Sequence, residues 1–160
     1  MPIATKSSKI DISLEKDTKS IAQKFSNYIE KGDIIFLYGE IGVGKTTFIK
    51  YLINILQSNN RIYETEVPSP TFNLVNEYQI KDFIIQHYDL YRLKDEKESK
   101  NIGLFENYKD VLTFVEWPEI IKEKPNNRVE LFFNYEENFN KRNLIIFSDF
   151  KKQMIYDFKK

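Results

Sequence analysis

The sequence predicts a single α/β domain with a mostly parallel central sheet, which is flanked by helices and completed by a C-terminal pair of strands. Three observations support this prediction. Strand-like and helix-like segments alternate in the first half of the chain. The apolar runs DIIFLY and VLTFV have the length and composition of strands buried on both faces. The last two strand-like segments are separated only by a short polar loop.

The N-terminal third of the chain shows one short strand, one helix and one buried strand. The apolar residues of KIDISL, 9–14, alternate as on one face of a strand. The next segment has helical spacing, and we expect it to open with Asp17 or Thr18 as cap and to close at Gly32. The run at 33–38 is apolar throughout, which is typical of a central strand of a parallel sheet.

The middle of the chain continues with an amphipathic helix that follows a group of glycines and ends at SNN, 58–60. Two prolines then make 67–70 a rigid loop. We expect a strand to begin at Thr71 or Phe72 and a second strand to span 83–88. The order of elements so far is that of an α/β domain.

The remaining elements are mainly strands. The charged segment 94–108 predicts a helix or a mobile surface segment. A buried strand is expected over 111–119, halted by Pro118. The segments 128–135 and 142–150 are expected to pair as a hairpin. These strands complete the predicted sheet.

Composition limits the classes of function. The chain has 160 residues, so we expect one domain over 1–160, with a motif-bearing core at about 10–148 and a short polar tail at 151–160. Basic and acidic residues number 24 each, which predicts no general attraction to DNA or to a membrane. Cysteine is absent, so disulfides and thiolate chemistry are excluded. Without an apolar leader or a membrane-length apolar run, a cytoplasmic protein is the simplest interpretation.

The stretch LYGEIGVGKTTFIK contains the motif G-x-x-x-x-G-K-S/T, known as the P-loop. Gly39, Gly42 and Gly44 allow the backbone to curl so that its N–H groups point at a phosphate. Lys45 is expected to reach the β- and γ-phosphates, and the Thr46 hydroxyl to bind Mg²⁺. Because a strand precedes the motif and a helix follows it, the sequence predicts a P-loop NTPase fold.

Two acidic residues that end predicted strands complete a magnesium site. Asp89 follows FIIQHY and Glu116 closes VLTFV, so both are expected near Thr46 at one edge of the sheet. One would hold the metal and the other would orient the attacking water, but the sequence does not assign these roles. A GTPase is disfavoured, because the nearest match to N-K-x-D, NKRN at 140–143, lacks the acid.

The words GEIGVGKTTFIK, VPSPTFNLVNEY, HYDLYRL and VEWPE, in this order, closely resemble the TsaE (YjeE) family, the P-loop ATPase of bacterial threonylcarbamoyladenosine biosynthesis. The resemblance covers residues 10 to about 148. It implies binding of ATP or ADP with Mg²⁺ and partnership with TsaB and TsaD. Those partners transfer a threonylcarbamoyl group onto N6 of the adenosine next to the anticodon, in tRNAs that read A-starting codons. The family also implies weak ATPase activity alone, hydrolysis that resets the partner complex, and contact with tRNA through that complex; the sequence does not show whether tRNA also touches this chain directly.

The motif and the resemblance together give the candidate site. We expect Lys45, Asp89 and Glu116 to be catalytic, and Thr46, Glu116 and Asp89 to hold the metal. His87 and Arg92 are left between structural and functional roles. A small-molecule kinase and a non-catalytic nucleotide sensor stay open as alternatives. The residues expected to bind the nucleotide are Gly39, Glu40, Ile41, Gly42, Val43, Gly44, Lys45, Thr46, Thr47, Thr71 and Trp117.

Overall fold

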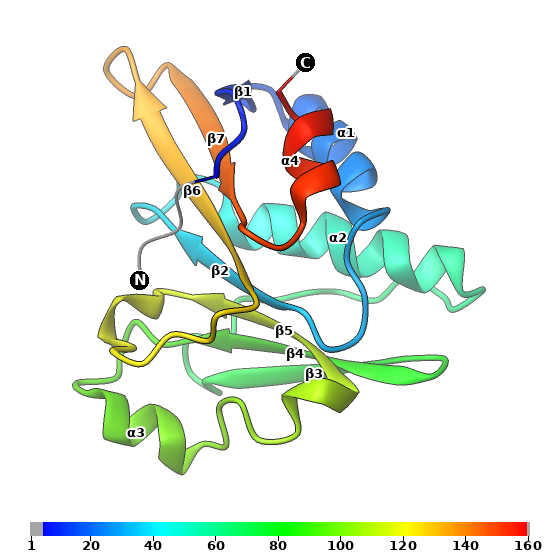
Figure 1. Cartoon of the computed structure of the whole chain (residues 1–160), viewed down its shortest axis with the longest axis vertical. Helices are drawn as coiled ribbons and strands as arrows, with labels where there is room; N and C mark the ends of the chain where they lie inside the picture. The colour runs from blue at the N-terminus through cyan, green and yellow to red at the C-terminus, as the bar shows by residue number, and fades with distance from the viewer. Residues whose placement is uncertain (1–4, 160) are drawn as a thin grey trace.

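The computed structural model describes residues 5–159, so residues 1–4 and 160 of the expected domain lie outside the described residues. Within 5–159 the chain forms one seven-stranded sheet and four α-helices (Figure 1). The strands are β1 Ile10–Asp11, β2 Ile34–Tyr38, β3 Val75–Ile80, β4 Phe83–Asp89, β5 Val111–Glu116, β6 Arg128–Glu136 and β7 Lys141–Phe147. The helices are α1 Glu15–Ser26, α2 Lys45–Asn59, α3 Glu96–Asn101 and α4 Lys152–Asp157, with 3₁₀ turns η1 Tyr108–Asp110 and η2 Pro118–Ile120.

The sheet is mixed: the predicted parallel arrangement is found among the central strands, whereas the outer strand pairs are antiparallel. Its strand order is β1-β7-β6-β2-β5-β4-β3. The four central strands, β6, β2, β5 and β4, run parallel, whereas the pairs β1–β7, β7–β6 and β4–β3 are antiparallel. The β3–β4 and β6–β7 pairs are hairpins with short turns, and a short turn can join only antiparallel strands. The single α/β domain and its C-terminal strand pair are confirmed.

The two faces of the sheet carry separate cores. Helices α1, α2 and α4 pack on one face, while α3 lies on the other side (Figure 1). Strand β2 supplies side chains to both, because Ile35 and Leu37 join the core under the helices and Ile34 and Phe36 join the opposite one. The prediction of a strand buried on both faces is confirmed.

The predicted boundaries at the N-terminus need correction. Strand β1 has only two residues, and Leu14, the last apolar residue of the predicted strand pattern, is 55% exposed. Helix α1 begins at Glu15, before the predicted cap, because Thr18 faces inward and its hydroxyl donates to the Ile12 carbonyl. The helix ends at Ser26, and Gly32, with φ of +96°, belongs to the turn that leads into β2.

Strands β3 and β5 also differ from their predicted limits. The strand expected from Thr71 or Phe72 begins at Val75, because the preceding residues form a turn in which the Leu74 N–H donates to the Pro70 carbonyl at 2.6 Å. Strand β5 ends at Glu116 rather than at 119, since the next residue, Trp117, has the left-handed φ of +58°.

The C-terminal segment 151–160 is not simply a polar tail. It contains α4, and Met154, Ile155 and Phe158 are buried in the core under the helices. The described part of this segment is therefore packed against the hydrophobic core, although it carries none of the predicted site residues. Among residues 5–159 we find no helix with the length and apolar character needed to cross a membrane.

Candidate functional site

Residues 39–44 form a glycine-rich loop between β2 and α2. Gly39, Gly42 and Gly44 have φ of +148°, +80° and +119°, values that L side chains rarely adopt. At Gly39 a Cβ would also lie 2.8 Å from the Phe133 carbonyl oxygen, so a side chain does not fit there. The loop thus brings the N-terminus of α2, the positive end of the helix dipole, to the carboxyl ends of the parallel strands.

Lys45, the first residue of α2, turns its side chain back into this loop. It is only 4% exposed, and its ammonium donates to the carbonyls of Gly39 and, at 3.1 Å, Glu40. The same ammonium lies 4.1 Å from the centre of the Trp117 ring. The loop therefore folds around a buried cation.

Burial lowers the pKa of Lys45, because the charged ammonium loses water. The negative charges of Glu116, Glu119 and Asp89 oppose this shift. A buried ammonium with neutral carbonyls as its hydrogen-bond partners is a strong attractor for an anion that enters the loop.

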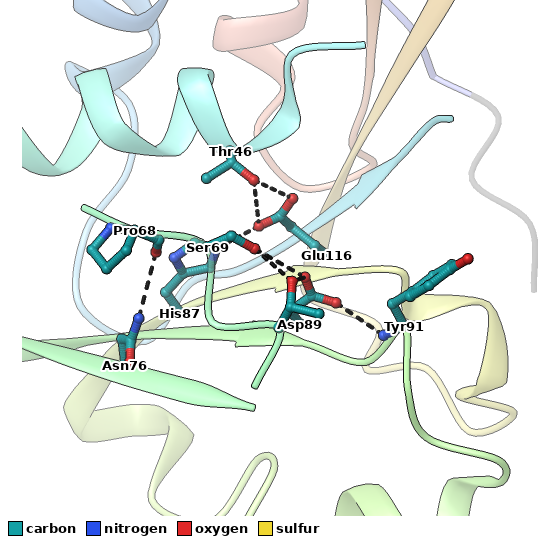
Figure 2. Close-up of polar contacts among 9 residues, drawn as sticks. Thr46, Pro68, Ser69, Asn76, His87, Asp89, Tyr91 and Glu116 are labelled. Carbon is teal, nitrogen blue, oxygen red and sulfur yellow. Dashed lines mark hydrogen bonds and ion pairs between the residues drawn. The ribbon is translucent and has the colours of Figure 1, made fainter. Parts of the chain in front are cut away.

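Glu116 connects α2 to the sheet (Figure 2). The Thr46 hydroxyl faces both oxygens of its buried carboxylate, at 2.9 Å to Oε1 and 3.1 Å to Oε2. From the neighbouring strand β4, Nε2 of the fully buried His87 lies 2.6 Å from Oε2. Since an ionised carboxylate only accepts hydrogen bonds, Nε2 carries the proton and donates. Glu116 is therefore held from two sides.

Asp89 ends β4 and is held by a different set of groups (Figure 2). The Thr71 hydroxyl donates to its Oδ2 at 3.0 Å, and the Ser69 hydroxyl lies 3.4 Å from the same oxygen. The two hydroxyls are 2.8 Å apart. The Tyr91 N–H donates to Oδ1 at 2.9 Å. Asp89 thus joins the turn after Pro68 to the end of the sheet.

These groups surround a cavity of about 320 Å³. Most of the predicted nucleotide-binding residues line it, while Gly39 and Glu40 offer carbonyls to Lys45 and Val43 is buried in the core. The cavity is lined by Ile41, Gly42, Gly44, Lys45, Thr46, Thr47, Ser69, Thr71, Asp89, Tyr91, Glu116, Trp117 and Arg142.

Four residues that the structure brings to this site were not among the predicted site residues. The resemblance implies that the word containing Ser69 lies near the nucleotide, and Tyr91 lies within the word DLYR, which could have identified it. His87 was left undecided and contacts Glu116 directly. Arg142 had no signal in the sequence, because it comes from β7 and reaches the loop only through the fold.

The oxygen atoms around the cavity suit a hard divalent cation. The Thr46 hydroxyl and the Glu116 and Asp89 carboxylates are the ligand types that Mg²⁺ prefers. Over residues 5–159, no group of three or more His, Cys, Asp or Glu side chains is arranged to hold a metal by itself. This donor set fits a magnesium ion that shares its coordination with water and phosphate oxygens, as Mg²⁺ usually does.

A family model described as threonylcarbamoyl adenosine biosynthesis protein TsaE matches residues 12–144 of the chain. Two relatives carry the name tRNA threonylcarbamoyladenosine biosynthesis protein TsaE. The protein from Rickettsia bellii is 42% identical over 108 residues, which are 68% of this chain and 72% of the relative. The protein from Rickettsia conorii is 40% identical over 108 residues, which are 68% of this chain and 59% of that longer relative.

The crystal structure of YdiB from Bacillus subtilis has a similar fold. Its TM-score is 0.72, and the match covers 99% of this chain and 96% of that one. At 23% identity this likeness concerns the fold alone.

Proposed function

The chain belongs to the TsaE family, and on this premise we propose that it binds Mg²⁺ and ATP and hydrolyses ATP in tRNA threonylcarbamoyladenosine biosynthesis. The main support for this proposal is that Lys45, Thr46 and Glu116 line the same cavity at the N-terminus of α2. A cation, a hydroxyl and a carboxylate at this place are the parts that phosphoryl transfer requires. We assign the domain to the P-loop NTPase fold on the same grounds.

Binding of the phosphates would follow from the loop itself. Its glycines allow backbone N–H groups to converge, and the dipole of α2 favours negative charge. Lys45 would exchange the carbonyls of Gly39 and Glu40 for β- and γ-phosphate oxygens, which are stronger partners for an ammonium.

The magnesium ion would be held by Thr46 and Glu116, directly or through water. When bound, it neutralises charge that develops on the phosphates. Asp89, fixed by the Thr71 hydroxyl and the Tyr91 N–H, would orient the attacking water at the γ-phosphate end. His87 would act on the reaction only by positioning Glu116.

We further propose that TsaB and TsaD are the partners, and that tRNA is reached through them. Three large apolar side chains around the cavity support a docking surface at its mouth: Ile41 is 69% exposed, Phe72 84% and Tyr91 53%. A partner that covers them would exclude water from the site and speed hydrolysis. Slow turnover of the protein alone would follow from this arrangement, and the family resemblance suggests that hydrolysis resets the partner complex.

The test is ATP hydrolysis, measured as phosphate release with and without TsaB and TsaD. We expect slow turnover by the wild-type protein, stimulation by the partners, and loss of turnover in Lys45→Ala and Thr46→Ala. Lys50→Ala is the control, because this exposed lysine of α2 does not line the cavity. Wild-type rates in Lys45→Ala would contradict the site. Phosphate transfer to a nucleoside or sugar would identify a kinase instead.

A further inference from the structure

The β6–β7 hairpin packs against the glycine-rich loop. A Cβ at Gly42 would lie 3.4 Å from the Tyr135 hydroxyl, and a Cβ at Gly44 would lie 3.5 Å from Nη1 of Arg142. Tyr135 belongs to β6 and Arg142 to β7, and only Arg142 of these two also lines the cavity. The hairpin therefore places a guanidinium against the last residue of the loop.

The side chain of Arg142 joins the loop to the segment just before α1. Its Nη1 donates to the Val43 carbonyl at 3.4 Å, and its Nη2 donates to the Ser13 carbonyl at 3.1 Å. The backbone of Arg142 is fixed as well, because its N–H donates to the Ser13 hydroxyl at 3.0 Å and its carbonyl accepts from the Ile12 N–H at 3.0 Å. The guanidinium is thus held at a defined place beside the loop.

The hydrogen-bond partners of the Arg142 side chain are neutral. Over residues 5–159 this side chain forms no salt bridge, and both of its acceptors are backbone carbonyls. An arginine that served only the stability of the fold would gain more from a carboxylate than from carbonyls, because a pair of ionised groups forms the stronger hydrogen bonds. The choice of the Val43 carbonyl as partner therefore indicates a task at the loop.

The Val43 carbonyl controls the direction of the next N–H group. The peptide bond between Val43 and Gly44 is trans, so its carbonyl and its N–H point in opposite directions. Because Gly44 has no Cβ and accepts either sign of φ, steric contacts alone do not prevent this peptide from turning over. A turned peptide would present a carbonyl to a phosphate in place of an N–H. A donor that holds the Val43 carbonyl therefore keeps the Gly44 N–H available for a phosphate oxygen.

We propose that Arg142 is a positioning residue for the glycine-rich loop, which holds the Val43 carbonyl so that the Gly44 N–H is oriented for phosphate before the nucleotide binds. This role rests on the proposed ATP site and makes β7, a strand outside the loop motif, responsible for its preorganisation. Arg142 acts through the peptide bond between Val43 and Gly44 and not through contact with the nucleotide. Since preorganisation lowers the cost of ordering the loop on binding, its loss weakens phosphate binding.

The chain has only five glycines, so the surroundings of the Gly44 amide can be measured directly. Labelling with ¹⁵N-glycine gives one amide signal for each glycine in an NMR correlation spectrum, and Gly32 and Gly103, outside the loop, report on the fold as a whole. In the nucleotide-free protein we expect Arg142→Met to displace or split the Gly44 signal, because methionine is a similarly long, unbranched side chain that donates no hydrogen bond. The signals of Gly32 and Gly103 should not move.

Calorimetric titration with Mg·tripolyphosphate measures the consequence for phosphate binding. We expect Arg142→Met to weaken this binding about tenfold, as for the loss of one hydrogen bond from a charged donor. Arg142→Lys keeps the charge, but its single ammonium does not span the carbonyls of Val43 and Ser13. It should weaken binding about threefold and leave the Gly44 signal between those of the wild type and Arg142→Met.

Lys141→Met is the matched control. It removes a positive charge from the preceding residue of β7, which pairs with Glu137 and does not line the cavity, so both readouts should stay at the wild-type value.

The two readouts separate positioning from other roles. Weaker binding by Arg142→Met with an unmoved Gly44 signal would overturn the proposal, because Arg142 would then act on phosphate by its charge alone. A displaced Gly44 signal with wild-type binding would overturn it as well. If Arg142→Met does not fold, an unmoved Gly44 signal in Arg142→Lys has the same meaning. A wild-type protein that binds no tripolyphosphate would overturn the ATP site itself, whereas a displaced Gly44 signal in Arg142→Met would still support the hold on the loop.

Discussion

Asp89 and Glu116 occupy equivalent positions at the ends of neighbouring strands, yet their surroundings differ. The two residues are register partners in the parallel pair of β4 and β5, and both are almost fully buried. Glu116 contacts Thr46 of α2 and His87 of β4, which belong to regular elements. Asp89 contacts the hydroxyls of Ser69 and Thr71, which belong to a turn. Two side chains at equivalent backbone positions are therefore held by different parts of the fold.

The groups that contact Glu116 are held more rigidly than the groups that contact Asp89. Helices and central strands keep Thr46 and His87 in fixed places, which suits a metal ligand that must not shift. The turn that carries Thr71 also carries Phe72, which is 84% exposed, so a partner or a γ-phosphate can act on it. We therefore propose that Glu116 binds the metal and that Asp89 orients water at the γ-phosphate.

Glu116 is the carboxylate held by regular elements, and its replacement should have the largest effect on ATP turnover. Glu116→Gln keeps the shape of the side chain but removes the charge that a divalent cation requires. We expect ATP turnover to fall about 1000-fold and the Mg²⁺ concentration needed for half-maximal rate to rise. Phosphate release over a magnesium titration measures both.

The control for this variant is Glu123→Gln, because Glu123 is exposed, does not line the cavity and is not one of the acids whose charge acts on Lys45. Its turnover and magnesium dependence should match the wild type. Full turnover in Glu116→Gln would contradict the assignment and would favour a nucleotide sensor that does not need hydrolysis.

Asp89 is the carboxylate held by a turn, and its replacement should have a smaller effect on ATP turnover. Asp89→Asn keeps one oxygen, which can accept from the Tyr91 N–H, and its amide N–H can donate to the Thr71 hydroxyl, but it lacks the charge that orients a water. We expect turnover at saturating Mg²⁺ to fall about 100-fold with an unchanged magnesium dependence. Asp82→Asn, in the exposed turn between β3 and β4, is the control. A raised magnesium requirement in Asp89→Asn would reverse the two assignments.

The glycine-rich loop between β2 and α2 was predictable because its signals are local. The spacing of the glycines, Lys45 and Thr46 within one stretch reports directly on loop geometry. The meeting of Asp89 and Glu116 was also predictable, since ends of neighbouring parallel strands lie at one edge of a sheet. The hydrogen-bond partners of the two carboxylates could not be predicted. They come from a turn and from helix α2, which are far from Asp89 and Glu116 in sequence.

Other features depend on tertiary contacts that no local pattern reveals. Arg142 approaches the loop only because β6 pairs with β2 and carries β7 with it. The polar composition of 151–160 gave no sign of helix α4. Met154 and Ile155 of this helix and Phe158 just after it pack into the hydrophobic core, and three apolar residues on one side are enough to anchor so short a helix. Leu14 continued a strand pattern but is exposed, because α1 begins one residue later.

Replacing His87 changes only a neighbour of Glu116 and should have the smallest effect on the magnesium dependence of turnover. Its Nε2 donates to Glu116, while Nδ1 has no hydrogen-bond partner among the described residues. Glutamine can place an amide N–H near the Nε2 position, whereas asparagine places it near Nδ1. We expect His87→Gln to keep the magnesium dependence within about threefold of wild type and His87→Asn to weaken it about tenfold, as for other groups that orient a metal ligand.

The same pair of variants separates positioning from packing. Both replace a buried ring by a smaller amide, so both should lower the thermal unfolding midpoint in the absence of nucleotide. If His87 serves only the core, magnesium dependence will be the same in the two variants. If it positions Glu116, the glutamine variant will recover the metal response and the asparagine variant will not. Asp89 does not contact His87. Adding Asp89→Asn to either His87 variant should therefore lower ATP turnover by the same factor as in the wild type.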